Sequence, residues 1–159
     1  MRDLRLAALA DAPDAFAATL AQEASQPEAE WRARIGARPW FLGFRDGQPA
    51  GLIAALPPRP GPDQDQDQAW HLVSMWVSPH ARGGGLAGRL VGAVTEHASR
   101  AGAAQVTLWV AVGNERARAF YRRMGFTPTG RRQIYPRSGA AGLDEEEFAC
   151  PLSDPQRGP

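Results

Sequence analysis

The sequence predicts an α/β domain in which a mixed, twisted β-sheet carries helices on both faces. Two segments carry this prediction, because residues 70–100 and 106–124 each pass from an apolar strand through a glycine-containing turn into a helix. The third observation is the Asp46-Gly47 pair, which lies between two apolar runs and is typical of a tight hairpin turn. A chain of 159 residues, 43% of them hydrophobic, is long enough for one sizeable core.

The N-terminal part of the chain is predicted to be helical. It starts inside a helix that residues 11–13, Asp-Ala-Pro, interrupt, and residues 14–24 form a second short helix. Residues 25–28, Ser-Gln-Pro-Glu, fit a capping box that opens a third helix through Ile35.

The remaining elements follow from apolar runs and from the Gly, Pro and Asn residues that interrupt them. Residues 57–69 are rich in Pro, Asp and Gln and are predicted to form a mobile loop. The other predicted elements are strands at 40–45, 49–56, 70–77, 106–112, 126–135 and 146–152 and helices at 86–100 and 115–124. Together they form a single domain at residues 1–152, followed by a flexible tail at 153–159.

Residues 82–88, Arg-Gly-Gly-Gly-Leu-Ala-Gly, lie between the strand at 70–77 and a helix with an apolar residue at every fourth position. The glycines therefore form the first turn of that helix, where several backbone N–H groups lack intrahelical partners. Without side chains at 83–85 a bulky anion can approach these amides closely, and Arg82 adds a positive charge. The turn is predicted to bind a pyrophosphate. No Lys-Ser/Thr pair follows it, which excludes a P-loop.

Composition excludes several classes of protein. The formal net charge is +1, so neither a nucleic-acid partner nor a membrane surface is expected. The single cysteine, Cys150, precludes an internal disulfide and fits a reducing cytoplasm, which is the expected location. The sequence shows no transmembrane run and no signal peptide, and no metal site is expected.

Two short patterns occur in order along the chain. The first is Arg-x-x-Gly-x-Ala, at Arg82, Gly85 and Ala87. The second is an Asn followed by a helix that bears Phe-Tyr and ends in Gly-Phe, at Asn114, Phe120, Tyr121, Gly125 and Phe126. With both patterns in this order, the chain resembles the GNAT superfamily of N-acetyltransferases from about Leu4 to Leu152.

The resemblance implies that an acyl-CoA co-substrate, acetyl-CoA, lies between two parallel strands that splay apart. The backbone of Met75 and Val77 would pair with the pantetheine amides as an added strand would. Tyr121 would protonate the leaving thiolate, since a phenol with a pKa near 10 can supply a proton to a thiolate with a pKa of about 8.5. The implied cofactor-binding residues are Met75, Trp76, Val77, Arg82, Gly83, Gly84, Gly85, Leu86, Ala87, Asn114, Phe120, Tyr121 and Arg123.

The attacking amine must be neutral, so a general base or desolvation must help. Some relatives carry a Glu in the strand before the glycine turn, and the matching position here is Val73. His71, two residues earlier on the same strand face, is the candidate base, with a hydrogen-bonded structural histidine as the alternative. Relatives also begin with a strand before their first helix, so this sheet is expected to lack that first N-terminal strand.

The predicted function is transfer of an acetyl or other short acyl group to a primary amine of an unidentified acceptor, by direct attack in a ternary complex. Residues 11–40, 57–69 and 131–145 are expected to line the acceptor pocket. The acids at 145–147 indicate either a soluble strand edge or a patch that attracts a cationic amine. Dimers are common in the superfamily, so a homodimer is a further expectation.

Two other functions stay open. One is a non-catalytic acyl-CoA-binding or sensing module with the same fold. The other is a nucleotide-dependent oxidoreductase, because the glycines at 83–88 also fit Gly-x-Gly-x-x-Gly.

Overall fold

The computed structural model describes residues 1–58, 69–137 and 140–152. Most of the predicted 57–69 loop and the predicted 153–159 tail therefore lie outside the described residues. The helices are α1 (Arg2–Asp11), α2 (Leu20–Ala24), α3 (Glu28–Gly36), α4 (Leu86–Arg100) and α5 (Glu115–Arg123), with 3₁₀ turns η1 (Pro13–Ala15) and η2 (Pro79–Ala81). The strands are β1 (Trp40–Arg45), β2 (Gln48–Leu56), β3 (Ala69–Val77), β4 (Gln105–Ala111), β5 (Thr127–Arg137) and β6 (Ala140–Pro151).

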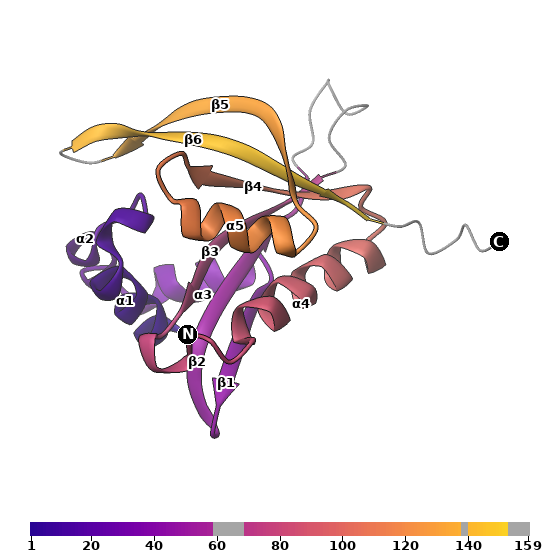
Figure 1. Cartoon of the computed structure of the whole chain (residues 1–159). Coiled ribbons are helices and arrows are strands. Elements are labelled where there is room, and N and C mark those ends of the chain that lie inside the picture. The colour runs from indigo at the N-terminus through magenta and orange to yellow at the C-terminus, as the bar shows by residue number, and fades with distance from the viewer. Residues whose placement is uncertain (59–68, 138–139, 153–159) are drawn as a thin grey trace.

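The strands form one sheet in the order β1-β2-β3-β4-β6-β5. Among these strands β3 and β4 pair in parallel, whereas every other pair of neighbours is antiparallel. Helices α4 and α5 pack on one face of the sheet, and α1 to α3 lie on the other (Figure 1). The predicted mixed α/β fold is confirmed, and within residues 1–58 no strand precedes α1.

The hairpin and the long helix form where the sequence predicts them. Asp46 and Gly47 adopt positive φ angles of 50° and 76°, as the tight turn between β1 and β2 requires. The apolar stripe of α4 is buried in the larger core, with Leu90 at 3% and Val94 at 0% exposure. Gly102, at φ 77°, follows the end of α4 as predicted.

The capping box predicted at Ser25 is wrong. The box lies at α2, where Thr19 Oγ1 accepts from Gln22 N at 3.2 Å and Gln22 Oε1 accepts from Thr19 N at 2.9 Å. Ser25 is instead the C-cap of α2 and donates its hydroxyl to Gln22 O, so it is not free to start α3. Pro27 is the N-cap of α3 and makes no side-chain cap bond.

Strand β6 begins at Ala140, well before the predicted start at Glu146. Asp144 and Glu145, which precede the predicted strand, are therefore strand residues as well, because β6 extends beyond the apolar run that predicts it. Polar cross-strand contacts with β5 stabilise them: Gln133 Nε2 donates to Glu145 Oε2 at 2.9 Å, and Arg132 lies 3.8 Å from Asp144.

A buried ion pair joins the first three helices. Arg5 of α1 donates to both carboxylate oxygens of Glu23 of α2 at 3.0 and 2.9 Å, and Arg34 of α3 lies 2.9 Å from the same group. Burial raises the pKa of Glu23, but the hydrogen bond and charge of Arg5, with the charge of Arg34, outweigh it and lower the pKa overall. The Arg5 guanidinium also lies 4.4 Å above the ring of Phe16, so the pair orients the chain that follows α1.

We expect Glu23→Gln to lower the free energy of unfolding by about 3–5 kcal/mol, because it leaves the buried Arg5 charge uncompensated. Urea denaturation at pH 7 measures this. The matched control is Glu28→Gln, which removes an exposed helical pair with Arg32 and should cost less than about 0.5 kcal/mol.

The same pair predicts a pH dependence. The lowered pKa of Glu23 stabilises the fold above the ordinary glutamate pKa of about 4.3, and this stabilisation is lost as the pH falls through the lowered value. The stability difference between wild type and Glu23→Gln should therefore shrink in strongly acidic buffer. A difference that is the same at pH 7 and pH 3 would contradict this assignment.

Candidate active site

The site is a cleft between the parallel strands β3 and β4. In their register Ala69 pairs with Gln105 at one end and His71 pairs with Thr107 at the other. Beyond His71 no residue of β3 pairs with β4, although β3 continues to Val77. A bulge in β3 shifts its register with β2: Leu52 pairs with Trp76, but Ala54 pairs with Val73. Ser74, inside this bulge, adopts φ 60°. A bulge bends a strand and re-aims its backbone, so the two strands splay apart.

The cleft has a volume of about 1210 Å³ and is lined from both faces of the sheet. Phe120 and Tyr121 reach it from α5, on the face that α4 and α5 cover. Phe16 and Trp109 also line it, and Phe16 packs with the core on the opposite face. A ligand can therefore approach from one face and a second ligand from the other.

The open edge of β3 offers backbone groups to a ligand. Ser78 N donates to Ala50 O at 2.8 Å, which places the backbone of Ser78 toward β2. Because strand residues alternate in direction, Met75 and Val77 point their backbone groups toward the splayed side. Val77 O accepts from Arg82 Nε at 3.0 Å, which leaves the N–H of both residues and the carbonyl of Met75 for an added chain.

The glycine turn ends this edge and presents bare amides. Gly83 and Gly85 adopt φ 80° and 75°, and Gly85 is the N-cap of α4 without any side-chain cap bond. Behind the turn, Arg45 Nη1 donates to His80 O at 2.6 Å and Arg89 Nη1 donates to Gly84 O at 3.2 Å. The carbonyls of His80 and Gly84 are thus bonded, and no side chain caps the amides at the start of α4, an arrangement that fits an anion.

Arg82 contacts Asp11, the last residue of α1. Arg82 Nη2 pairs with Asp11 Oδ2, and Trp76 Nε1 donates to the same oxygen at 2.8 Å. The hydrogen bond from Trp76, followed by Arg82, lowers the pKa of Asp11 below its usual range, although partial burial opposes this. The sequence places Asp11 at a helix end and at the start of the 11–40 segment, but nothing local indicates a contact with residues so distant in the chain.

Tyr121 lies in a cluster of aromatic rings at the cleft. Its side chain is 7% exposed and makes edge contacts with Phe120 and Phe126, at centroid distances of 5.1 and 5.7 Å. Burial raises the pKa of Tyr121 well above its ordinary value, so the hydroxyl stays protonated at neutral pH. Asn114 caps α5 by accepting from Ala117 N at 3.0 Å, which leaves its Nδ2 to donate to a ligand.

The structure gathers most of the predicted site residues. Each predicted cofactor-binding residue except Gly84 lines the cleft. His71, the candidate base, is not among the described lining residues, whereas Val73 is. Its Nδ1 bonds Thr107 Oγ1 at 2.9 Å at the closed end of the splay, which favours the structural alternative.

Parts of the segments expected to line the acceptor pocket reach the cleft. These are residues 11–16 of the 11–40 segment, with Leu143 and Glu145 of the 131–145 segment, whereas most of the 57–69 segment lies outside the described residues. Cys150 is half-buried and outside this lining, and burial raises the pKa of its thiol. Within residues 1–58, 69–137 and 140–152 no three metal-ligating side chains cluster. No helix in those ranges is long and apolar enough to cross a membrane.

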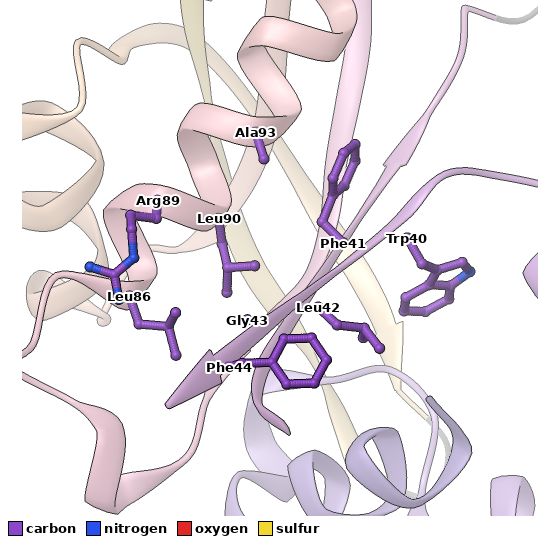
Figure 2. A pocket seen from close by; sticks show the side chains of 9 residues that line it. All are labelled: Trp40, Phe41, Leu42, Gly43, Phe44, Leu86, Arg89, Leu90 and Ala93. Atoms are coloured by element: carbon purple, nitrogen blue, oxygen red, sulfur yellow. The ribbon is translucent and has the colours of Figure 1, made fainter. Parts of the chain in front are cut away.

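A second, smaller hollow of about 420 Å³ lies between β1 and α4 (Figure 2). Its wall is mostly apolar, and Arg89 is the ionisable side chain among its lining residues. Gly43 lets Leu86 approach the strand closely, since a Cβ there would lie 2.7 Å from Leu86 Cδ1. The hollow presents no group for acid–base chemistry beyond that guanidinium, so the cleft is the candidate site.

Comparisons with known proteins agree with this geometry. Residues 6–126 match the model of the acetyltransferase (GNAT) family. An uncharacterized N-acetyltransferase of Methanocaldococcus jannaschii is 29% identical over 97 residues, which span 61% of this chain and 42% of the relative.

Solved structures share the fold. A ribosomal-protein-alanine N-acetyltransferase from Brucella melitensis has a TM-score of 0.69 and 26% identity, with 96% of each chain covered. A Bacillus subtilis acetyltransferase in complex with CoA has a TM-score of 0.60 and 16% identity, over 79% of this chain and 84% of that one.

The left-handed glycine turn predicts opposite effects for two Gly→Ala changes. Gly83→Ala meets no atom within 4 Å but forces alanine to φ 80°, which should cost about 1–2 kcal/mol of stability. Gly92→Ala, inside α4 and equally uncrowded, should stabilise by about 0.5–1 kcal/mol through helix propensity. Urea denaturation measures both, and shifts of the same sign would show that the turn conformation is wrongly assigned.

Proposed function

The chain belongs to the GNAT family of acetyltransferases, and we propose that it transfers an acetyl group from acetyl-CoA to a primary amine. The observation that carries the proposal is the splayed pair β3–β4, which joins an open strand edge to the bare amides of the glycine turn. A CoA thioester has the matching chemistry, with peptide-like amides along its pantetheine arm and a diphosphate beyond them.

In the proposed complex the pantetheine arm lies beside β3. Its amides pair with Met75 and Val77, and its diphosphate accepts from the amides of residues 83–87 at the positive end of α4. Asn114 Nδ2 donates to the arm, and Arg123 at the far end of α5 reaches a phosphate. Arg82 shares its guanidinium between Asp11 and the anion.

The proposed reaction is direct attack on the thioester. The amine nitrogen bonds to the acyl carbon, the C–S bond breaks, and Tyr121 donates its hydroxyl proton to the leaving sulfur. Burial makes Tyr121 a weaker acid than its ordinary pKa suggests, so this proton moves only as the C–S bond breaks. No acyl-enzyme is proposed, since Cys150 is outside the cleft lining.

The acceptor amine must lose a proton. At pH 7.4 only about one in 10³ lysine-type amines with a pKa of about 10.4 is neutral, a deficit of roughly 4 kcal/mol, whereas roughly a fifth of peptide α-amines with a pKa of about 8 are neutral. The Brucella melitensis neighbour is named for alanine of a ribosomal protein. A peptide with a free N-terminal alanine is therefore the first acceptor to test, by release of free thiol from acetyl-CoA.

A non-catalytic acyl-CoA-binding module remains the second candidate, because the open edge of β3 and the amides of the glycine turn would bind the cofactor without any catalytic group. The oxidoreductase alternative finds no support. Dinucleotide folds use consecutive parallel strands with the first glycine directly after the strand, whereas here η2 intervenes and β3–β4 is the parallel pair of the described sheet.

The anion site at the glycine turn predicts that Gly83→Glu binds acetyl-CoA at least tenfold more weakly than Gly83→Gln, or by about 1.4 kcal/mol, because it places a carboxylate beside the diphosphate. Gly83 lines the cleft, and a Cβ there would meet no atom within 4 Å. Both variants carry the same backbone strain at φ 80°, so the comparison isolates the effect of the charge. Titration calorimetry measures the two affinities, and equal affinities would exclude an electrostatic role of the turn.

The proposed role of Tyr121 predicts that Tyr121→Phe lowers kcat about 10²-fold or more and leaves acetyl-CoA affinity nearly unchanged. The phenyl ring keeps its packing against Phe120 and Phe126 while the proton donor is lost. Steady-state thiol release and calorimetry measure the two quantities. A wild-type chain that binds acetyl-CoA but shows no turnover with any amine would favour the sensing module.

A further inference from the structure

We propose that Glu145 of β6 is the general base that receives the acceptor's amine and takes its proton. The proposal rests on the acetyl transfer proposed above. It replaces His71, which bonds Thr107 away from the cleft lining, with a carboxylate that lines the cleft. It also assigns a role to one of the acids at 145–147, for which the sequence leaves open a soluble strand edge or a patch that attracts a cationic amine.

The register of β6 places Glu145 on the acceptor face. Glu145 pairs with Ala111 and Glu147 pairs with Trp109, so these four side chains lie on one face of the sheet. The alternate residue Phe148 is fully buried in the core beneath α4 and α5, on the other face. Glu145 and Tyr121 therefore reach the cleft from opposite faces.

Contacts distinguish Glu145 from its acidic neighbours. Glu146 pairs with Arg118 of α5 at 2.6 Å, on the other face. Glu147 is buried and accepts from Thr129 Oγ1 at 2.9 Å. Glu145 accepts from Gln133 on Oε2, and no donor among the described residues bonds its Oε1. One carboxylate oxygen is thus positioned by Gln133, and the other is available to an ammonium group.

Apolar side chains line the same cleft as Glu145. Phe16, Trp109 and Leu143 line the same cleft, and the Arg5 guanidinium holds the Phe16 ring from the side of α1. A partly desolvated amine favours its neutral form, and its attraction to a carboxylate is stronger than in bulk water. The pocket therefore fits a primary amine joined to an apolar or peptide-like body.

The proton balance of the step is complete with these two groups. The ammonium gives one proton to the Glu145 carboxylate before or during attack, and the resulting amine bonds to the acyl carbon. After the C–N bond forms, the nitrogen releases its surplus proton to solvent, while the sulfur takes the Tyr121 proton as the C–S bond breaks. Exchange with water then restores the Glu145 carboxylate and the Tyr121 hydroxyl.

Other charged groups face the cleft and enter its pH dependence. They are Asp11 at the end of α1, Asp14 of η1, Arg82 of the glycine turn, and Arg116 and Arg123 of α5. Asp11 is bonded by Trp76 and Arg82. Because these groups are present in the wild type and the variant alike, the informative quantity is the ratio of the two activities at each pH.

The test compares Glu145→Gln with His71→Gln and wild type. Gln retains an oxygen that accepts from Gln133, so the β5–β6 contact is preserved. The matched control is Glu96→Gln, the same change on the exposed face of α4. The acceptors are a peptide with a free N-terminal alanine, an N-terminally acetylated peptide with one lysine, and water, whose slow hydrolysis of acetyl-CoA needs no added amine.

We expect Glu145→Gln to lower kcat at pH 7 about 10²-fold or more, with unchanged acetyl-CoA affinity and normal activity in Glu96→Gln. The loss should be larger for the lysine amine than for the α-amine, and it should shrink as the pH approaches the pKa of the amine. A purely structural role of Glu145 would lower activity equally at every pH.

Three outcomes would overturn the inference. Loss of activity in His71→Gln with full activity in Glu145→Gln would make His71 the base. Full activity in both variants would mean that desolvation alone suffices. A wild-type chain that neither binds nor hydrolyses acetyl-CoA would overturn the proposed function itself. This result is separate from a failure of the Glu145 inference, because it is seen in the wild type before any variant is compared.

Discussion

The loss of pairing between β3 and β4 beyond His71–Thr107 is the constraint on which the rest of the site depends. A parallel pair that continued to Val77 would satisfy the backbone groups that now face the cleft. The residue that accompanies the splay is Ser74, which adopts a left-handed conformation at the bulge in β3. A ligand could reach the cleft and the glycine turn only because this edge of β3 stays unpaired.

The helix N-termini differ in whether a side chain of the protein bonds their backbone amides. Helices α2 and α5 carry side-chain caps, from Thr19 and Asn114, each of which accepts a backbone N–H of the first turn. Helices α1, α3 and α4 carry none, and among these α4 is the one whose N-cap, Gly85, lines the cleft. Its uncapped amides thus face the space between β3 and β4, and the Arg5–Glu23 pair holds the opposite wall of the cleft in place.

Sequence reasoning predicted what local chemistry dictates. The Asp46-Gly47 turn, the apolar stripe of α4 and the glycine turn each follow from a few neighbouring residues, and the cofactor side of the cleft follows from them. It could not predict contacts that depend on distant partners. Nothing near Asp11 indicates Trp76, and nothing near Glu145 indicates Gln133, because strand pairing brings these residues together. The candidate base His71 stays a prediction, and its contact with Thr107 depends on where the β3–β4 pairing ends, which face alternation alone does not say.

The short parallel register has a mechanical consequence. It joins two antiparallel halves of the sheet, β1-β2-β3 and β4-β6-β5, through backbone bonds near one end only. Such a seam transmits little cooperativity between the halves, which must rely on the helices packed across it. An extended ligand that hydrogen-bonds along the open edge of β3 would add contacts between the two halves of the sheet. With the cleft occupied, the two halves would therefore unfold in one cooperative step.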